Sequence, residues 1–395
     1  MKDHVEVLVV GGGSAGLTVA ARLRNHPNPP EVAILEPNTK HYYQPLWTLV
    51  GAGVFPKEAS ERNEADFIPP GATWLQDAAE SFDPENNRVT TRAGKTYSYD
   101  FLVVAAGLQL DWEKIPGLKE SVGKPGTGVC SNYDYNTVTS TWDNIRNFKG
   151  GTAIFTEPST MIKCGGAPQK IMYLADDAFR RQGVRERSRL LYCSPKKTIF
   201  AVKKYADELD KVIARKGLEP RWEHELKALH PERKEAVFTY PGGEVTMPYD
   251  MIHVTPPMSA PDVIKKSPLA NADGWVDVDK HTLQHTTYKN VFGLGDNSSL
   301  PTSKTGAAIR KQAPVVAENL LKLRAKEPLG ASYDGYTSCP LVTGYGSLIL
   351  AEFDYDKNPA ESFPFDQSKE RYSMYLLKKV GLPNLYWHGM LRGRA

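Results

Sequence analysis

The feature that most constrains the fold is a glycine-rich turn near the start of the chain. The segment Gly11-Gly-Gly-Ser-Ala-Gly16 has the spacing G-x-G-x-x-G and follows the apolar run at residues 5–10 directly. Such a turn between a strand and a helix lets the backbone approach a pyrophosphate, and the helix N-terminus supplies N–H donors. Glu36 ends the next apolar run, about 20 residues later, where an acceptor for a ribose hydroxyl is expected. We therefore predict a dinucleotide site formed by Gly11, Gly13, Ser14, Ala15, Gly16 and Glu36.

The length of the chain, 395 residues, favours two or three domains. Hydrophobic residues make up 41% and charged residues 24%, which is typical of globular proteins. Apolar runs alternate with helix-like segments before residue 110 and again between residues 152 and 255, which predicts an α/β fold with two Rossmann-like dinucleotide-binding domains. We place the first domain at residues 1–110 and 285–330, and the second at residues 111–284. An aromatic, Gly-rich and basic C-terminal module follows at residues 331–395.

The second domain lacks the glycine turn. After the apolar run at residues 152–156 comes Glu157-Pro-Ser-Thr-Met-Ile-Lys-Cys-Gly-Gly-Ala-Pro-Gln-Lys170, in which Pro158 removes a backbone donor. We therefore do not expect NAD(P)H as the electron source. Cys164 stands before a helix expected to begin near Pro168, and the helix N-terminus with its neighbouring lysines favours a thiolate. An inert buried cysteine is the alternative.

Charge and cysteine usage exclude several classes of protein. The net charge of +3 argues against a nucleic-acid partner, and the positive charge is concentrated in residues 369–395, with six basic residues and one acidic residue. The four cysteines and nine histidines show no metal-binding spacing, and four cysteines are too few for a secreted disulfide scaffold. We predict no metal site, no export signal and no apolar run long enough to span a membrane.

Several motifs resemble those of one known family. Asp100-Phe-Leu-Val-Val-Ala-Ala-Gly107 and Asn290-Val-Phe-Gly-Leu-Gly-Asp296 resemble the later motifs of flavoproteins with two dinucleotide domains. Lys163-Cys-Gly-Gly-Ala-Pro-Gln-Lys170 and Tyr336-Thr-Ser-Cys-Pro-Leu-Val-Thr-Gly344 resemble motifs of the sulfide:quinone oxidoreductases, in the flavin disulfide reductase superfamily. Further matches are His253-Val-Thr-Pro-Pro-Met258, Leu300-Pro-Thr-Ser-Lys-Thr305 and Phe363-Pro-Phe-Asp-Gln-Ser-Lys-Glu-Arg371. The resemblance covers essentially the whole chain and is greatest to the mitochondrial-type branch.

The resemblance implies FAD as the cofactor and a role for each motif. It implies that Cys164 and Cys339 form a catalytic redox pair, with a persulfide on Cys339 and a flavin-facing thiolate on Cys164. Cofactor contacts would come from Ala106, Gly107 and Asp296, the last near the ribityl–phosphate region. The implied partners are hydrogen sulfide, ubiquinone or a similar quinone, and a sulfur acceptor such as sulfite, glutathione or coenzyme A.

Lys304 and two aromatic residues are further candidates. By resemblance Lys304 would stabilise negative charge on reduced flavin or on a quinone oxygen, and a solvated surface lysine is the alternative. Phe363 and Phe365 are expected to hold a quinone ring between them, with core packing as the alternative.

The tail at residues 372–392 mixes Leu, Met, Tyr and Trp with Lys and Arg. We expect Gly381 and Pro383 to break it into two short helical pieces that lie in a membrane interface. The prediction is a peripheral, monotopic protein on the bacterial cytoplasmic membrane, or on the mitochondrial inner membrane of a eukaryote. Docking on its own domain, or on a second copy in a homodimer, is the alternative.

Three alternatives to the sulfide:quinone oxidoreductase function are considered: an NADH:quinone oxidoreductase, a flavocytochrome-type sulfide dehydrogenase and a redox-sensing flavoprotein without catalysis. The missing second glycine turn argues against the first, the missing export signal against the second, and the presence of both Cys164 and Cys339 against the third. We predict that Cys130 is inert rather than placed beside the flavin. Cys193 and His253 are expected to be structural.

Overall fold

The first sheet forms around the apolar run that precedes the glycine turn. In the computed structural model, which describes residues 3–395, β1 (His4–Val10) pairs in parallel with β2 (Val32–Leu35) and with β8 (Thr96–Val104). β19 (Val291–Gly293) joins the other side of β8, also in parallel. Strands buried on both faces need nearly continuous apolar sequence, which these strands have. The sheet is completed by β5 (Thr73–Leu75), β6 (Ala79–Asp83) and β7 (Arg88–Thr91).

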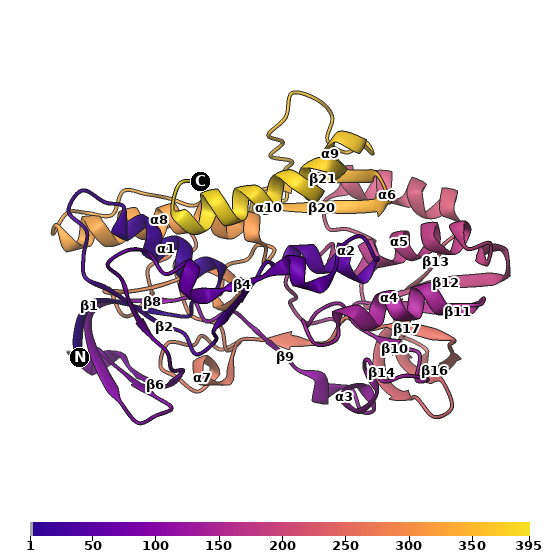
Figure 1. Cartoon of the computed structure of the whole chain (residues 1–395), viewed down its shortest axis with the longest axis horizontal. Helices are drawn as coiled ribbons and strands as arrows, with labels where there is room; N and C mark the ends of the chain where they lie inside the picture. Colours follow the sequence, from indigo (N-terminus) through magenta and orange to yellow (C-terminus); the bar gives the residue numbers. More distant parts are fainter. Residues whose placement is uncertain (1–2) are drawn as a thin grey trace.

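Two helices pack together against this sheet. α1 (Ser14–Arg24) begins at the glycine turn, as the sequence predicts, and packs along α8 (Gly306–Arg324). Figure 1 shows the two helices side by side although nearly 300 residues of sequence separate them.

The second half of the chain builds its own parallel sheet. Its strand order is β10-β17-β11-β12-β13, and every neighbouring pair is parallel. The prediction of two Rossmann-like α/β units is therefore confirmed. A small antiparallel sheet of β14 (Glu225–His230), β15 (Glu235–Tyr240) and β16 (Gly243–Pro248) was not predicted. The strands are β10 (Val129–Cys130), β11 (Gly151–Thr156), β12 (Ser188–Ser194), β13 (Glu219–Trp222) and β17 (Met251–His253); the helices are α4 (Val138–Asn147), α5 (Ala167–Arg181) and α6 (Lys203–Lys216).

The chain crosses between the two halves and returns along the same path. β9 (Gln109–Leu110) leaves the first half and pairs antiparallel with the returning β18 (Met258–Ser259). Beyond β18, α7 (Asp262–Lys265) contacts β6, and Val276 forms a bridge with Ser298. Residues 260–284 thus pack on the first sheet, and we propose to move the domain boundary from residue 285 to about residue 260.

The C-terminal module consists of a hairpin and a helical tail. The hairpin β20 (Thr337–Gly344) and β21 (Ser347–Phe353) packs on α5. The tail then runs as one continuous helical segment from α9 (Tyr372–Leu376) through α10 (Leu382–Asn384) to a final turn at Met390–Arg392 (Figure 1).

The prediction that Gly381 and Pro383 divide the tail is wrong. Pro383 lacks an N–H and would break a regular α-helix. Here π-helical turns at Leu377–Gly381 and Leu385–Gly389 flank it, and such turns shift the hydrogen bonding around the missing donor without ending the helix. Over residues 3–395 we find no helix with the length and apolar character needed to cross a membrane.

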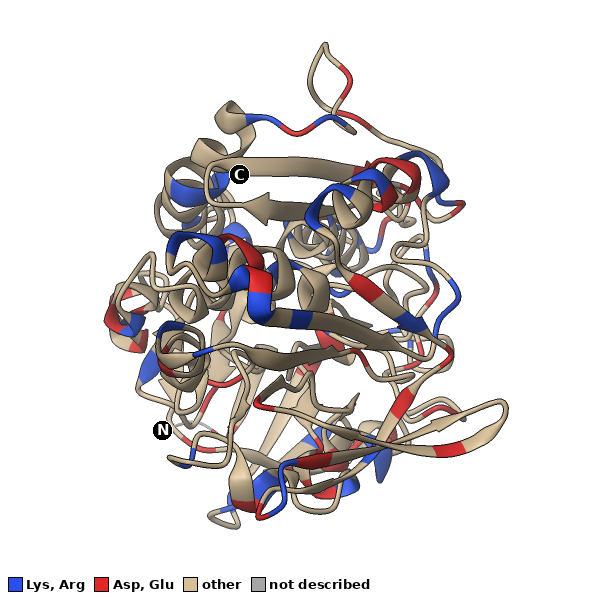
Figure 2. Ribbon diagram, turned by 90° about the vertical axis from the view of Figure 1, so that its right-hand side faces the viewer, with Lys and Arg blue, Asp and Glu red and all other residues tan. Residues whose placement is uncertain are grey.

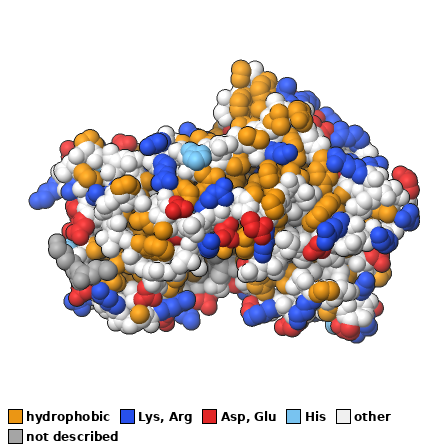
Figure 3. Space-filling model, viewed as in Figure 1, with side chains coloured by type: hydrophobic (Ala, Val, Ile, Leu, Met, Phe, Trp, Pro, Cys, Tyr) orange, Lys and Arg blue, Asp and Glu red, His pale blue; other side chains and the backbone are white. Residues whose placement is uncertain are grey.

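The tail exposes large apolar side chains. They are Tyr372, Leu376, Val380 and Leu385, and the first and third are 63% and 54% exposed. Hydrophobic side chains gather over this part of the molecule in Figure 3. On the side shown in Figure 2, acidic and basic residues are interspersed instead.

Candidate active site

Some glycines of the turn leave no space for a side chain, and others border space that a ligand could fill. A Cβ on Gly11, whose φ is +105°, would lie 2.4 Å from the Ala105 carbonyl oxygen, and one on Gly16 would lie 1.8 Å from that of Gly11. A Cβ on Gly13 or Gly107 would meet no atom within 4 Å. α1 has no side-chain cap, so no side chain occupies the N–H groups of its first turn. The turn therefore has the shape and the donors that a pyrophosphate needs.

Glu36 is fixed beside this turn at the end of β2. Its Oε2 accepts a hydrogen bond from the Gly12 N–H at 2.8 Å, and its Oε1 accepts from the backbone and side chain of Asn38 at 2.8 and 2.6 Å. A carboxylate held here can accept from ribose hydroxyls. The residues present fit a dinucleotide.

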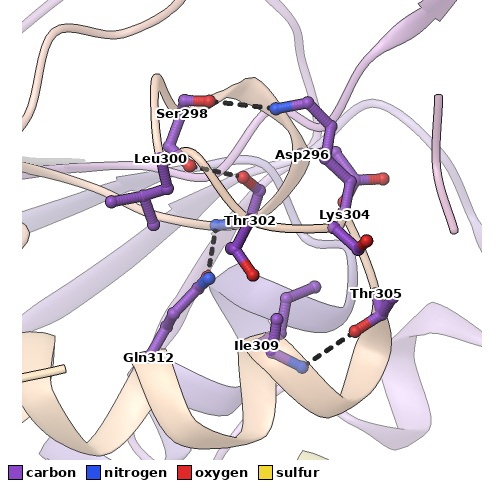
Figure 4. A pocket seen from close by; sticks show the side chains of 11 residues that line it. Asp296, Ser298, Leu300, Thr302, Lys304, Thr305, Ile309 and Gln312 are labelled. Carbon is purple, nitrogen blue, oxygen red and sulfur yellow. Dashed lines mark hydrogen bonds between the residues drawn. The ribbon is translucent and has the colours of Figure 1, made fainter. Parts of the chain in front are cut away.

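A small pocket lies between β19 and the start of α8, and Figure 4 shows its lining. The Gly295 N–H donates to Gln312 Oε1 at 2.9 Å, and Thr305 Oγ1 caps α8 by accepting from Ala308 N at 3.0 Å. The Gly107 N–H donates to Asn297 Oδ1 at 3.2 Å. These contacts place Gly107 beside the segment that carries Asp296. Residues of the motifs at 100–107, 290–296 and 300–305 therefore lie in one region.

Lys304 lies inside the protein, and the alternative of a solvated surface lysine is wrong. Only 5% of it is exposed; its Nζ donates to the Ser298 carbonyl oxygen at 2.9 Å and lies 3.9 Å from the centre of the Trp275 ring. Burial lowers the pKa of Lys304 to about 8, opposed by the charge of Asp296. A parallel bridge between Lys304 and Lys163 joins this segment to the loop that carries Cys164.

The two cysteines named by the resemblance meet. Cys164 Sγ lies 3.7 Å from Cys339 Sγ, which is fully buried on β20. Cys164 has φ +87°, a region that side chains other than glycine rarely occupy and that clusters at functional sites. A Cβ on Gly166 would lie 2.3 Å from Leu341 Cδ2, so the glycine lets this loop approach β20.

The pair has unequal electrostatic surroundings. The buried Lys170 ammonium donates to Cys164 Sγ at 3.3 Å. The hydrogen bond with Cys339 and the charge of Lys170 hold the pKa of Cys164 well below its ordinary value, whereas the same hydrogen bond and burial raise the pKa of Cys339. When both cysteines are reduced, these surroundings favour the thiolate on Cys164 and the thiol on Cys339.

The tail adds a lysine that the sequence analysis missed. Lys378 is 5% exposed, and its Nζ donates to the Pro45 carbonyl oxygen at 3.1 Å. Burial, with a contribution from the charge of Lys170, lowers the pKa of Lys378 to about 7, and the two cysteines oppose this change. The signal in the sequence is a lysine within an amphipathic run, which does not reveal where the run docks.

The remaining candidates have structural surroundings. Cys130 and Cys193 are buried in strands, and burial raises the pKa of each to about 12. His253 is fully buried, and its Nε2 lies 2.9 Å from Asn132 Oδ1. Phe363 and Phe365 stack on each other with centroids 5.3 Å apart, which leaves no room for a quinone between them. Contact of a quinone with one of these rings stays a proposal.

The end of β11 carries a negative charge where the second domain would otherwise have a glycine turn. Glu157 is 2% exposed and accepts from the hydroxyls of Tyr192 and Ser194, both at 3.0 Å, and pairs with Lys196. The residue that follows β11 is therefore an ion-paired carboxylate and not the first glycine of a dinucleotide turn. Among residues 3–395, no group of three His, Cys, Asp or Glu side chains is placed to hold a metal ion.

Comparison with known proteins identifies the family to which the chain belongs. The family described as pyridine nucleotide-disulphide oxidoreductase matches residues 5–313. The mitochondrial sulfide:quinone oxidoreductase of Dictyostelium discoideum is 51% identical, covering 100% of this chain and 87% of the relative. That of Mus musculus is 50% identical, covering 99% and 87%. The crystal structure of the sulfide:quinone oxidoreductase of Aquifex aeolicus has a TM-score of 0.83 at 21% identity, covering 99% of this chain and 92% of that one. The chain belongs to the sulfide:quinone oxidoreductase family, within the pyridine nucleotide-disulphide oxidoreductases.

Proposed function

We propose that this chain oxidises hydrogen sulfide and passes the electrons to a quinone. The observation that carries the proposal is the pair of cysteines, 3.7 Å apart, with a buried ammonium 3.3 Å from one of them. Two sulfur atoms at this separation need only small movements to form or break a disulfide bond. The pKa of Cys164 is lowered and that of Cys339 is raised, so Cys164 is the better leaving group when hydrosulfide attacks the pair.

We propose FAD as the cofactor, held by the first domain. Its pyrophosphate would lie at the glycine turn and its adenosine ribose at Glu36. Asp296 and Lys304 would lie toward the flavin. When bound, FAD supplies a two-electron acceptor that can be reoxidised by a quinone.

The sulfur step uses the inequality between the two cysteines. In the bridged, oxidised pair, hydrosulfide attacks Cys339 Sγ, a new sulfur–sulfur bond forms on Cys339, and the bond to Cys164 breaks. Cys164 leaves with the electron pair as a thiolate, which Lys170 stabilises. The lower pKa of Cys164 makes it the better leaving group.

The cycle closes when a nucleophile removes the added sulfur. Sulfite, a small thiol such as glutathione or coenzyme A, or a second hydrosulfide attacks the outer sulfur of the persulfide and leaves Cys339 as a thiolate. Re-forming the bridge from the two reduced cysteines releases two electrons, for which bound FAD would be the acceptor and the quinone the final oxidant. Buried cations at Lys170 and Lys378 stabilise the negative charge that the pair carries before the bridge forms again.

We propose that the helical tail holds the protein on the membrane that contains the quinone. Its exposed apolar side chains at Tyr372, Leu376, Val380 and Leu385 can enter the interface, while its basic residues other than the buried Lys378 would face anionic headgroups. The relatives are named as mitochondrial proteins, and we propose that this membrane is the mitochondrial inner membrane.

Anaerobic visible spectroscopy of the FAD-loaded protein tests the proposal. Sulfide should bleach the flavin bands, and a short-chain quinone should restore them. Cys339→Ser should keep its FAD but no longer respond to sulfide, because the bridge cannot form. Cys193→Ser is the matched control, since it makes the same change in a strand of the core. Bleaching of Cys339→Ser at the wild-type rate would refute the sulfur mechanism.

A further inference from the structure

A chain of buried polar groups connects the end of the tail to the glycine turn. Tyr386, in the π-helical turn Leu385–Gly389, lies with its hydroxyl 2.7 Å from Ser14 Oγ and 2.5 Å from His41 Nε2. His41 Nδ1 lies 2.9 Å from Glu64 Oε2. Glu64 is 1% exposed, and His41 and Tyr386 are 4% exposed. The polar groups of Glu64, His41 and Tyr386 are therefore shielded from water, and Ser14 is half-buried.

The far end of this chain of groups is incomplete. Glu64 Oε1 has no hydrogen-bond partner within the described part of the chain, residues 3–395. A Cβ placed on Gly12 would lie 2.4 Å from this same oxygen, so the oxygen faces the glycine turn beside Glu36. Burial raises the pKa of Glu64, opposed by the hydrogen bond with His41. A buried carboxylate oxygen without a partner is costly unless a ligand supplies a donor.

The packing around Tyr386 fixes the position of its hydroxyl. Its ring lies 4.5 Å from that of Tyr43 and 5.0 Å from that of Trp387, and Trp387 packs 5.1 Å from Phe67. The next turn of the tail rests on α1, the helix that begins at the cofactor turn. Asn25 Nδ2, at the end of α1, donates to the Arg392 carbonyl oxygen at 2.8 Å.

We propose that Glu64, His41 and Tyr386 complete the dinucleotide site together with Ser14, so that binding of FAD and docking of the tail stabilise each other. The inference rests on the proposed function, because it takes FAD as the ligand of the glycine turn. Glu64 Oε1 supplies a further acceptor for a hydroxyl of the cofactor, and Tyr386 orients the Ser14 hydroxyl at the start of α1. Tyr386 is thus a positioning residue contributed by the membrane-facing tail.

Reciprocity follows from this arrangement. If the docked tail raises the affinity for FAD, bound FAD must favour the docked tail by the same factor. The same segment presents the apolar side chains that we assign to the membrane, so the attached cofactor and the membrane-binding surface belong to one cooperative unit.

The test compares Tyr386→Phe with Tyr375→Phe. Both remove a hydroxyl from a buried tyrosine of the tail, but the structure gives Tyr375 no side-chain hydrogen bond within residues 3–395. Dissociation of FAD is followed by the fluorescence of the released cofactor. Tyr386→Phe should release FAD about tenfold faster than the wild type, the scale of one lost hydrogen bond to a polar network. Tyr375→Phe should release it at the wild-type rate.

Hydrogen exchange of the tail supplies a second readout that does not depend on activity. In the wild type, FAD should slow the exchange of amides at residues 385–392, and in Tyr386→Phe and Ser14→Ala this protection should be lost. Equal release rates in Tyr386→Phe and wild type, or equal protection by FAD, would overturn the inference while leaving the proposed function intact. A wild-type protein that holds no FAD would overturn both.

Discussion

Replacement of Lys170 by methionine should raise the pKa of the Cys164 thiol by two units or more. The Lys170 ammonium lies 3.3 Å from Cys164 Sγ. At an effective dielectric constant of about 20, unit charges at this distance attract by about 5 kcal/mol, which equals between about three and four pKa units. Lys378 remains nearby and still lowers the pKa of Cys164, so we expect the shift to be smaller than the full amount.

The measurement follows the ultraviolet absorbance of the thiolate against pH in a Cys339→Ser background. Serine can still donate a hydrogen bond to Cys164, and one sulfur of the pair is left to titrate. Burial raises the pKa of Cys130 and of Cys193 to about 12, so these two thiols titrate outside the range of interest.

Lys163→Met is the matched control. Its amine donates to Gln44 Oε1 at 2.8 Å and to the Tyr133 carbonyl oxygen at 3.0 Å, and it is not bonded to the sulfur. The control should shift the pKa of Cys164 by less than about one unit. Equal shifts in Lys170→Met and Lys163→Met would refute the assignment of the thiolate to one local ammonium.

Three further predictions concern the tail and the core. Leu376→Glu with Val380→Glu should weaken binding to lipid vesicles at least tenfold by sedimentation, because about 1.5–3 kcal/mol is lost for each large apolar side chain. Tyr240→Glu, at the exposed end of β15, should leave binding unchanged. The pKa of Lys378 in the folded protein, about 7, lies below its ordinary value of 10.5. Between these two pH values the unfolded state binds more protons than the folded state, so the wild type gains stability as the pH rises. Lys378→Met should lose this pH dependence in urea unfolding and be a few kcal/mol more stable than the wild type near pH 7; a parallel pH profile would contradict the burial argument. Cys130→Ala should keep the wild-type rate of bleaching by sulfide, because the Cys130 thiol donates to the Ile252 carbonyl oxygen at 3.5 Å inside the core, and a slowed rate would place Cys130 in the reaction.

Local patterns predict the two Rossmann-like units because each depends on short-range chemistry. Apolar runs give the parallel strands, and the glycine turn gives the start of α1. α4 was not predicted, because Val138–Asn147 is rich in Thr, Ser and Asn, which have low helix propensity. Its Val138 and Ile145 are buried, and the helix packs on α2 (Trp47–Gly51) and α5, so tertiary contacts stabilise it. Pro340 argues against a strand, yet a hairpin of only two strands has open edges that tolerate a proline.

Part of the active site was also predictable from the sequence. The spacing of the glycines predicts the dinucleotide turn, and the family resemblance predicts the cysteine pair. Lys378 and Tyr386 could not, because their contacts with Pro45 and Ser14 join residues 333 and 372 positions apart. Such contacts depend on where a helix docks, and an amphipathic pattern shows which face is apolar but not which surface receives it.

The continuous tail has a mechanical consequence. It lies against β21 at its start and against α1 at its end, so it bridges the half that carries the cysteine loop and the half that carries the dinucleotide turn. Two halves of a protein that are joined by a short connection, here β9 and β18, can rotate about it unless other contacts hold them together. In this protein the helical tail is one such contact, beside the packing of α2 on α4 and α5, and bending the tail would expose the aromatic cluster at its end. We therefore expect the two halves to keep their relative orientation during turnover. The turnover rate should then not fall as solvent viscosity rises, because no closure of the halves limits it.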